Sequence, residues 1–330
     1  MAQPALDFFK RRGVAVKAEV TENVDSVPVA GTNGIMLMNG KSGTEFDKKE
    51  RMVDRAFFTG DPFSVSNKRA FIEGEFDLYS PSVPGVAVTG VADVAPVLLP
   101  CGLAQTLTGA TNKQSQYNPI STAIPTVSAY FWHVDTLKKL TGARGNLSSL
   151  KMEVGERYKG TLRLQGNYTT VTTQAVPAIT LPSTVPPVST YANSVAYIDP
   201  DGAGGGAELL VWCKMLELSF NNALTSKEYT SVIFQSISDR KATWKMRIAR
   251  TDLADFNPWT VRDAGTIITG RFRTTETGTL YSQLSFRGQI EAIDEVDIDG
   301  DYGWELSGPC IASNTGGDEF RILFGDSTGV

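Results

Sequence analysis

The second half of this chain repeats, in order and spacing, a set of features found in the first half. Tyr117-Asn118-Pro119 in the first half corresponds to Phe256-Asn257-Pro258 in the second. Each is followed by an apolar segment typical of a strand, and then by a long alternating segment that ends in Leu-x-Gly, at Leu164–Gly166 and Leu306–Gly308. The interval from the Asn-Pro pair to the glycine has nearly the same length in both halves. Repetition of this kind predicts that one structural unit occurs twice, which favours a building block over an enzyme.

The bulk properties are those of a globular protein of about two domains. The chain has 330 residues, of which 41% are hydrophobic and 20% charged, and its formal net charge is -5. An acidic balance disfavours tight binding of nucleic-acid phosphates, but it suits a surface past which DNA moves without sticking. No apolar stretch approaches the ~20 residues that span a bilayer, and residues 1–12 lack the apolar core of a signal peptide. We therefore expect no membrane association and a protein that is made and stays in a cytoplasm.

Short strand-like segments dominate the pattern. In the second half seven of them follow one another at regular spacing, which is typical of a β-sandwich or barrel. They are residues 209–220, 230–238, 242–249, 266–272, 280–291, 303–307 and 320–324. A short helix is expected around residues 255–263. The predicted fold is therefore mainly β, with two tandem sandwich or barrel modules that each carry a short flanking helix.

Composition places the boundaries of the two modules. Residues 173–194 are rich in Thr, Ser, Pro and Val, which predicts a semi-rigid linker. The first module is then 1–172 and the second 195–330. The first module contains a long polar loop at 40–67. It also contains an insertion at about 79–116, absent from the second module, which holds the best helix candidate.

No catalytic, cofactor or metal site is predicted. The single histidine, His133, lies in an aromatic strand without a Ser or Cys motif beside it, which favours a packed or edge histidine. Three cysteines at wide spacings give no zinc signature and favour buried, reduced thiols. Gly202–Ala207 matches a dinucleotide fingerprint, but a strand follows it where a helix is needed, so we expect a flexible turn. Asp297–Asp301 resembles a calcium loop, but its glycine stands too early for an EF-hand, so we expect an Asp-Gly hairpin turn.

A set of turns and strands spread over both halves matches the pattern of a known family. In the second half the set comprises Asp255–Pro258, Thr266–Phe272, Ser282–Leu284, the acidic strand after it and Gly316–Phe324. In the first half it comprises Gly31–Gly34, Arg69–Leu78, Leu98–Gly102, Tyr117–Pro119, Gly142–Gly145 and Gly166–Tyr168. Over roughly residues 15–326, the chain resembles the major tail tube proteins of long-tailed, non-contractile, siphovirus-type phages.

The resemblance implies a structural subunit of a phage tail tube, without enzymatic activity or cofactor. Members of this family stack as rings into a hollow conduit that delivers the genome DNA. Their partners are copies of themselves, the tape measure protein, and the distal tail or initiator and terminator proteins, while double-stranded DNA passes transiently. The expected location is the tail of a virion, after assembly in the host cytoplasm. Since many members carry one module and form hexamers, two modules per chain predict a trimeric ring with pseudo-six-fold symmetry, with a hexamer as the alternative.

Aromatic and acidic residues supply the candidate sites. Exposed aromatics in a polar segment suit a partner surface, so we expect five of them to reach into the next ring. These are Phe46, Phe57, Phe58 and Phe63 in the loop 40–67, and Tyr229 in the shorter loop 221–229. Acidic side chains repel phosphates, so an acidic strand suits a wall of the lumen. Its candidates are Glu291, Glu295, Asp297 and Asp299. Loops folded back on their own module, and an ordinary solvated acidic face, are the alternatives.

Two other functions remain open. A ring-forming protein at the tail end (distal tail, initiator or terminator) would share the pattern but should not polymerise alone. A carbohydrate-binding or hydrolytic β-sandwich would gather tryptophans and carboxylates on one face. The five tryptophans of this chain are dispersed along the sequence, which disfavours the carbohydrate-binding alternative.

Overall fold

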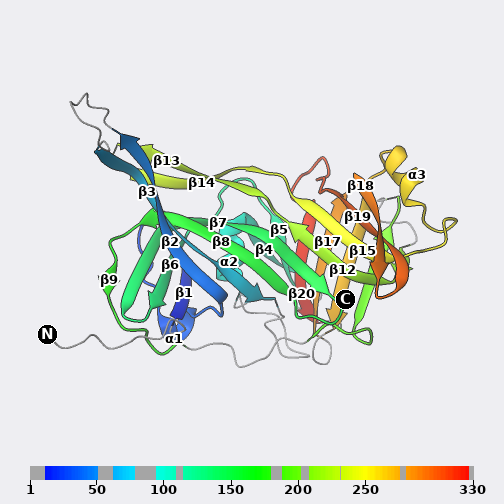
Figure 1. The fold of residues 1–330 in the computed structure, drawn as a ribbon, viewed down its shortest axis with the longest axis horizontal. Helices are drawn as coiled ribbons and strands as arrows, with labels where there is room; N and C mark the ends of the chain where they lie inside the picture. The colour runs from blue at the N-terminus through cyan, green and yellow to red at the C-terminus, as the bar shows by residue number, and fades with distance from the viewer. Residues whose placement is uncertain are drawn as a thin grey trace, which may run out of the picture.

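The computed structural model describes residues 12–50, 62–78, 94–108, 114–179, 188–201, 208–230, 232–275 and 280–326. Within these residues the protein is mainly β, as predicted, and its strands form two extended sheets with a projecting hairpin (Figure 1). The Gly202–Ala207 turn and the middle of the predicted linker lie outside the described residues.

The larger sheet runs through both halves of the chain. In spatial order its strands are β18 (Ala292–Ile298), β19 (Asp301–Pro309), β15 (Thr243–Ala249), β12 (Cys213–Ser219), β7 (Thr136–Glu153), β8 (Lys159–Tyr168), β3 (Phe63–Asp77) and β2 (Met38–Glu50). The long strand β7 also pairs with β6 (Val127–His133) and β9 (Thr172–Thr173), and β6 pairs with β1 (Arg12–Ala18).

The second sheet also draws on both halves. Its order is β11 (Leu209–Val211), β10 (Ser194–Asp199), β16 (Ile268–Thr275), β17 (Leu280–Gly288), β20 (Phe320–Asp326), β5 (Gln114–Pro119) and β4 (Leu103–Thr108). A separate hairpin consists of β13 (Asn222–Tyr229) and β14 (Val232–Arg240). The helices are short: α1 (Ala30–Asn33), α2 (Ala95–Leu98) with a 3-10 turn (Leu99–Cys101), and α3 (Pro258–Asp263).

Two antiparallel junctions join the halves. In the larger sheet β12 pairs with β7, which sets Leu218 opposite Leu150. In the second sheet β20 pairs with β5, which sets Ile322 opposite Tyr117. The segment 173–194 therefore separates strands that share both sheets, and the division into two modules stays a prediction.

Large aromatic side chains hold the two sheets together. Trp244 of β15 stacks on Phe286 of β17 with ring centroids 4.1 Å apart. Phe220, just after β12, packs on Phe320 of β20 at 4.4 Å. All four rings are buried. Burial of such a ring contributes about 1.5–3 kcal/mol, so these contacts are a main source of cohesion between the layers.

Two local predictions in the second half are confirmed. The helix expected around 255–263 is α3: the Asn257 side chain accepts a hydrogen bond from the Thr260 backbone N–H at 3.1 Å, and Pro258 occupies the first turn. The Asp-Gly turn joins β18 to β19, where Asp299 and Gly300 have φ of 56° and 98°. Two successive positive φ values are the signature of a type I′ hairpin turn.

The loop predicted at 40–67 is wrong over its described part. Strand β2 extends to Glu50 and β3 begins at Phe63, so most of this segment is a long hairpin. The outer part of the hairpin stands off the sheet, and most of its side chains are exposed or half-buried. A strand with solvent on both faces lacks the apolar alternation by which strands are recognised. The predicted loop 221–229 is likewise wrong, because it is the strand β13.

The insertion predicted as helical at 79–116 is only partly helical. Within its described residues, helical turns cover Ala95–Leu98 and Leu99–Cys101 alone, and β4 and most of β5 follow. Pro100 lies in the second turn, and Gly102 ends it with a φ of 84°. The apolar composition that suggested a helix instead serves buried residues of the core, among them Val97, Leu98 and Leu103.

Candidate assembly surface

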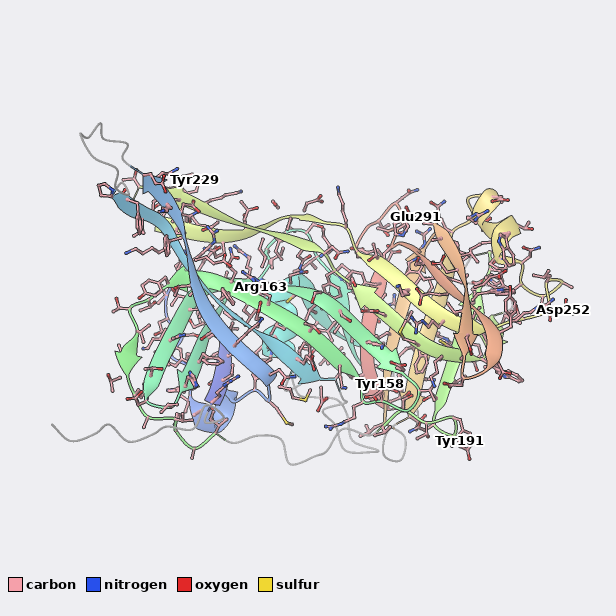
Figure 2. The ribbon with its side chains drawn as sticks, in the orientation of Figure 1. Tyr158, Arg163, Tyr191, Tyr229, Asp252 and Glu291 are labelled. Atoms are coloured by element: carbon pink, nitrogen blue, oxygen red, sulfur yellow. The ribbon has the colours of Figure 1, made fainter. Side chains whose placement is uncertain are left out.

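Two hairpins project together from the layers. The β2–β3 hairpin belongs to the first half, and the β13–β14 hairpin comes from the second half and runs back over the first (Figure 1). Their outer ends lie side by side, and Figure 2 shows Tyr229 there, far from Glu291 and Asp252. The protein therefore presents both hairpins at one end.

Each hairpin leaves its sheet at a bend marked by a phenylalanine. On β2 the register shifts at Phe46, opposite Asn67, which has a φ of 48°. Between β12 and β13 stand Phe220 and Asn221, and Asn221 has a φ of 51°. Asparagine tolerates this left-handed region better than most residues, so it suits a sharp change of direction.

A network of amides fixes the β13–β14 hairpin to the first half. Gln235 of β14 is 1% exposed. Its Oε1 accepts from Gln165 Nε2 at 3.0 Å, and its Nε2 donates to Asn167 Oδ1 at 3.1 Å and to Ser226 Oγ at 3.0 Å. Ser226 Oγ in turn donates to Asn67 Oδ1 on β3 at 2.7 Å. A buried polar network in which every member is paired specifies one arrangement of its elements.

Arg144 of β7 is the charged member of this contact. Its guanidinium donates to the Gln235 carbonyl, to Ile124 O at 3.2 Å and to Glu22 Oε1 at 2.9 Å. Its side chain is only 15% exposed. It thus ties the hairpin to two other segments of the first half.

Replacing Arg144 with methionine is expected to destabilise the protein by about 2–3 kcal/mol, because hydrogen bonds of charged groups contribute roughly 1.5–3 kcal/mol and their partners are left partly buried. The measurement is the free energy of unfolding in urea. Arg163→Met is the control: Arg163 also makes two ion pairs, but its side chain is 37% exposed, and exposed pairs contribute at most about 1 kcal/mol. Equal losses in the two variants would contradict the role given to Arg144.

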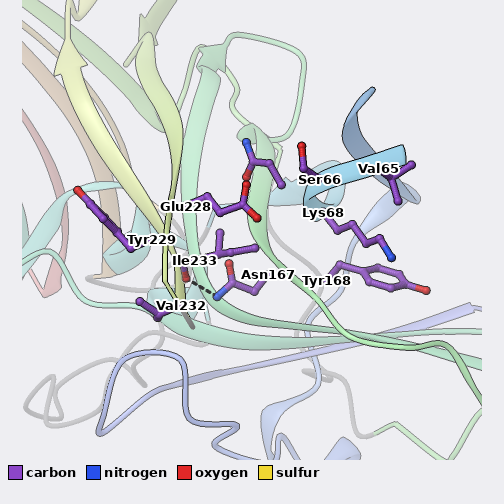
Figure 3. A pocket seen from close by; sticks show the side chains of 10 residues that line it. Val65, Ser66, Lys68, Asn167, Tyr168, Glu228, Tyr229, Val232 and Ile233 are labelled. Atoms are coloured by element: carbon purple, nitrogen blue, oxygen red, sulfur yellow. Dashed lines mark hydrogen bonds between the residues drawn. The ribbon is translucent and has the colours of Figure 1, made fainter. Parts of the chain in front are cut away.

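A cavity of about 530 Å³ lies between the two hairpins (Figure 3). Its lining includes Val65, Lys68, Tyr168, Glu228 and Tyr229. On its floor Asn167 Nδ2 donates to Ile233 O at 2.8 Å. The mixture of apolar, aromatic and oppositely charged side chains is that of a contact surface, with no grouping of acid, base and nucleophile.

The aromatic candidates lie on the hairpins, not in loops. Phe46, Phe63 and Tyr229 are 47%, 52% and 60% exposed, and Phe57 and Phe58 lie outside the described residues. Val65, 39% exposed, belongs to the same surface and was missed because a lone valine in a polar segment carries no signal. Their contact with a next ring stays a prediction.

The acidic candidates lie on or beside an edge strand. Glu291 precedes β18, Glu295 and Asp297 lie on it, Asp299 follows it, and all four are exposed. Asp299 Oδ2 lies 2.7 Å from Lys214 Nζ. A hydrogen bond with Glu295 raises the pKa of Tyr302 above its ordinary value.

The cross-strand pairing separates the acidic side chains of β18 between its two faces. Glu295 and Asp297 lie opposite Trp304 and Tyr302, whereas Asp294 lies opposite Glu305. Residues directly opposite in a sheet share a face. The lumen-facing role of the four candidates stays a prediction.

The face that carries Glu305 is a ladder of ion pairs. Glu305 accepts from Lys245 Nζ at 2.9 Å and from Arg247 Nε. On the first half Glu45 pairs likewise with Arg69 at 3.1 Å and with Arg163. Partial burial acts to raise the pKa of each carboxyl, but the hydrogen bonds from the two cations outweigh it, so both pKa values lie below the ordinary one. The outer face of the larger sheet is therefore polar and internally neutralised.

The residues that could carry other chemistry are placed without a catalytic arrangement. His133 ends β6, half-buried, with its ring 6.5 Å from that of Phe131. The three cysteines are free thiols, and burial raises the pKa of each, to about 12 for Cys310. In the part of the chain that the structure describes, no cluster of His, Cys, Asp and Glu could hold a metal ion, and no helix is long and apolar enough to cross a membrane.

The tryptophans do not form a sugar-binding platform among the described residues. Trp132, Trp244 and Trp304 are buried, and Trp259 packs edge-on against Trp304. Trp212 alone is widely exposed, at 81%.

No protein-family model and no curated protein sequence matches this chain.

Proposed function

We propose that this chain is a self-assembling structural subunit of a hollow tube, of the type that forms the tail of a long-tailed, non-contractile phage. Copies of the chain would be its main partners, with a tape measure protein inside and initiator and terminator proteins at the ends. The tube would conduct double-stranded DNA without binding it specifically. The free edges of the larger sheet carry this proposal.

The order of the strands supports a duplicated unit. In the first half the larger sheet runs β7-β8-β3-β2, and in the second half β18-β19-β15-β12. In each set the first two strands are neighbours in sequence, and the last two lead into and out of a projecting hairpin. The two Leu-x-Gly motifs occupy the same place: Gly166 lies opposite Ala70, and Gly308 lies opposite Trp244.

The free edges of this sheet match the junction inside it. The junction joins β12, the last strand of one set, to β7, the first strand of the other. Within the described residues, β2 and β18 each have one neighbour, and they are the last and first strands of the same two sets. An exposed edge is a template for pairing with another chain. Pairing β2 of one copy with β18 of the next would repeat the internal junction and close a ring.

The register of the internal junction can be carried over to the contact between copies. Leu150 lies opposite Gly160, which is six residues before Gly166 (166 − 160), and Asp297 lies opposite Tyr302, which is six residues before Gly308 (308 − 302). Leu218 lies opposite Trp244, and Thr44 lies opposite Ala70. Asp297 is thus the counterpart of Leu150, and Thr44 is the counterpart of Leu218. Between copies, we expect Asp297 to lie opposite Thr44, as Leu150 lies opposite Leu218 within the chain. With two units in each chain, three copies would close a ring of six units, and a ring of six copies is the alternative.

Electron microscopy of concentrated, negatively stained protein tests the proposal. Long hollow tubes with a regular axial repeat are the expected result, and their image symmetry separates three copies per ring from six. Isolated rings would favour the second candidate function, a tail-end protein that caps or initiates. Monomers at every concentration would contradict both, and thermal stabilisation by a panel of glycans would then favour a carbohydrate-binding sandwich.

A further inference from the structure

The contact between the β13–β14 hairpin and the first half has a counterpart site in the second half. In the first half the hairpin covers Gln165, beside Gly166 on β8, through the 3.0 Å contact with Gln235. Gln165 directly precedes Gly166, and Ser307 directly precedes Gly308, so Ser307 is the counterpart of Gln165. Thr243 is the counterpart of Arg69 on the neighbouring strand.

The counterpart site is hollow. A cavity of about 400 Å³ lies over Ser219, Thr243, Glu291 and Ser307. A second cavity, of about 380 Å³, adjoins it at Thr243 and extends over Pro309 and Cys310. In the first half this is the region that Gln235 and Arg144 fill. Among the described residues no hairpin covers it in the second half.

The β2–β3 hairpin is placed so that it could fill this site on another copy. It extends from β2, as the β13–β14 hairpin extends from β12, and β2 is the strand that would pair with β18 of a neighbour. Phe46 stands at its bend as Phe220 stands at the other bend. Phe220 is fully buried, whereas Phe46 is 47% exposed. Phe220 owes its burial to Phe320 of the second sheet. An apolar ring left exposed at the corresponding bend indicates a surface that a single chain leaves open.

We propose that the β2–β3 hairpin of a second copy of this chain docks over Thr243 and Ser307, as β13–β14 docks on the first half. The inference rests on the proposed assembly and adds to it a lateral clasp between neighbours. It also divides the exposed aromatics: Phe46 serves the clasp within a ring, and the outer residues Phe63 and Tyr229 remain available to the next ring.

The pairing within each hairpin identifies the residues that meet. On the returning strands, Ala70 corresponds to Trp244, so Pro62 corresponds to Ser236. Ser236 adjoins Gln235, the residue that contacts Gln165. Pro62 of one copy is therefore expected to lie beside Ser307 of its neighbour.

A mixed cross-linking experiment tests this contact. One preparation carries Pro62→Cys and the other Ser307→Cys, so that a disulfide between them can only join different copies. Under mild oxidation at assembling concentrations, a covalent dimer of twice the 35.7 kDa chain is expected. All preparations also carry Cys310→Ser, because Cys310 lines the proposed site. Burial raises the pKa of the other native thiols, Cys101 and Cys213, and the thiolate is the reactive species.

The controls separate the clasp from the assembly itself. Pro62→Cys mixed with Thr106→Cys, on the distant strand β4, should give no dimer. Asn67→Cys with Ser226→Cys in one chain should form a link within that chain, because these side chains are 2.7 Å apart. Tubes or rings that form from the mixed preparation without a Pro62–Ser307 dimer would overturn the clasp and leave the tube proposal intact. If the folded variants, checked by thermal melting, neither assemble nor cross-link, both proposals fall.

Discussion

Replacing Lys41, Lys48 and Lys49 with glutamate is expected to abolish assembly while leaving the monomer folded. These lysines lie on β2, and the edge strand that would pair with it is acidic. In the proposed register Lys41 falls near Asp299, and Lys48 and Lys49 fall near Glu291. Reversing three charges sets like charges along the whole edge, which opposes pairing. The cost within the monomer is small, because Lys41 and Lys48 are 70% and 48% exposed in their ion pairs, and such pairs contribute at most about 1 kcal/mol.

The measurement is sedimentation of the variant, with electron microscopy of the pellet. Adding Glu291→Lys and Asp299→Lys at the two ends of β18 should restore assembly, since in the proposed register these positions lie near the new glutamates. A control with the same change in net charge places glutamate at Lys17, Arg262 and Arg321, away from β2 and β18, and should assemble normally. Assembly of the β2 variant at low salt, where charges are least screened, would contradict pairing between these edges.

The acidic residues of β18 could also determine which strand edge pairs with it. Two copies of β18 brought edge to edge would place only carboxylates together, whereas β2 also brings lysines to β18, although its Asp47 and Glu50 fall beside Asp294 and Glu291. Charged side chains on edge strands commonly prevent wrong pairing. We therefore expect these residues to select the partner edge, in addition to any role in the lumen.

Replacing Gly308 with alanine is expected to destabilise the protein by about 3 kcal/mol or more, at the upper end of the cost of overpacking. A Cβ on Gly308 would lie 2.0 Å from the backbone oxygen of Gln289 and 3.0 Å from the backbone nitrogen of Glu291. Neither atom belongs to a side chain that can turn aside, so the start of β18 would have to move. The measurement is the urea midpoint, with loss of soluble expression as the extreme result.

Gly13→Ala is the matched control for this change. Its Cβ would also meet an atom at 2.0 Å, but that atom is the terminal Cδ1 of Ile179, which can change rotamer. The expected loss is below about 1 kcal/mol. If both alanine variants unfold at the same urea concentration, the close backbone approach at Gly308 does not constrain the fold.

The Leu-x-Gly repeat shows what the sequence could predict. Gly166 faces the same kind of restriction as Gly308, because its Cβ would lie 2.9 Å from Leu140 Cβ and 3.0 Å from the Thr141 oxygen. Gly166 lets β7 approach closely, and Gly308 does the same for the segment between β17 and β18. The two alternating segments that end in these glycines do form strands, β8 and β19.

The hairpins and the insertion could not be predicted in the same way. The β2 and β13 strands carry polar residues on both faces, so period-two alternation of apolar residues is missing. The apolar segment before Gly102 has the composition of a buried helix and of a buried strand alike. The β7–β12 and β5–β20 junctions join segments remote in sequence, and no local pattern states which edge meets which.

Some residues of the candidate assembly surface could be predicted from the sequence, and others could not. Phe46, Phe63 and Tyr229 could be selected, because an aromatic residue in a polar segment is unusual. The Gln235 network could not, because glutamine and asparagine are common on any surface and only the fold shows that these amides meet. The exposed aromatic residues of the hairpins were thus predictable in part, but the hydrogen bonds that fix the β13–β14 hairpin to the first half were not.

The pairing of β20 with β5 has a consequence for how the chain folds during synthesis. Tyr117 leaves the ribosome long before its cross-strand partner Ile322 exists. Until then β5 and β7 present open edges, and an incomplete chain can pair them with other copies. Contacts between residues so remote in sequence form slowly, and the intermediates that lack them are prone to aggregate. We expect the first half alone to aggregate, and the complete chain to unfold as one cooperative unit.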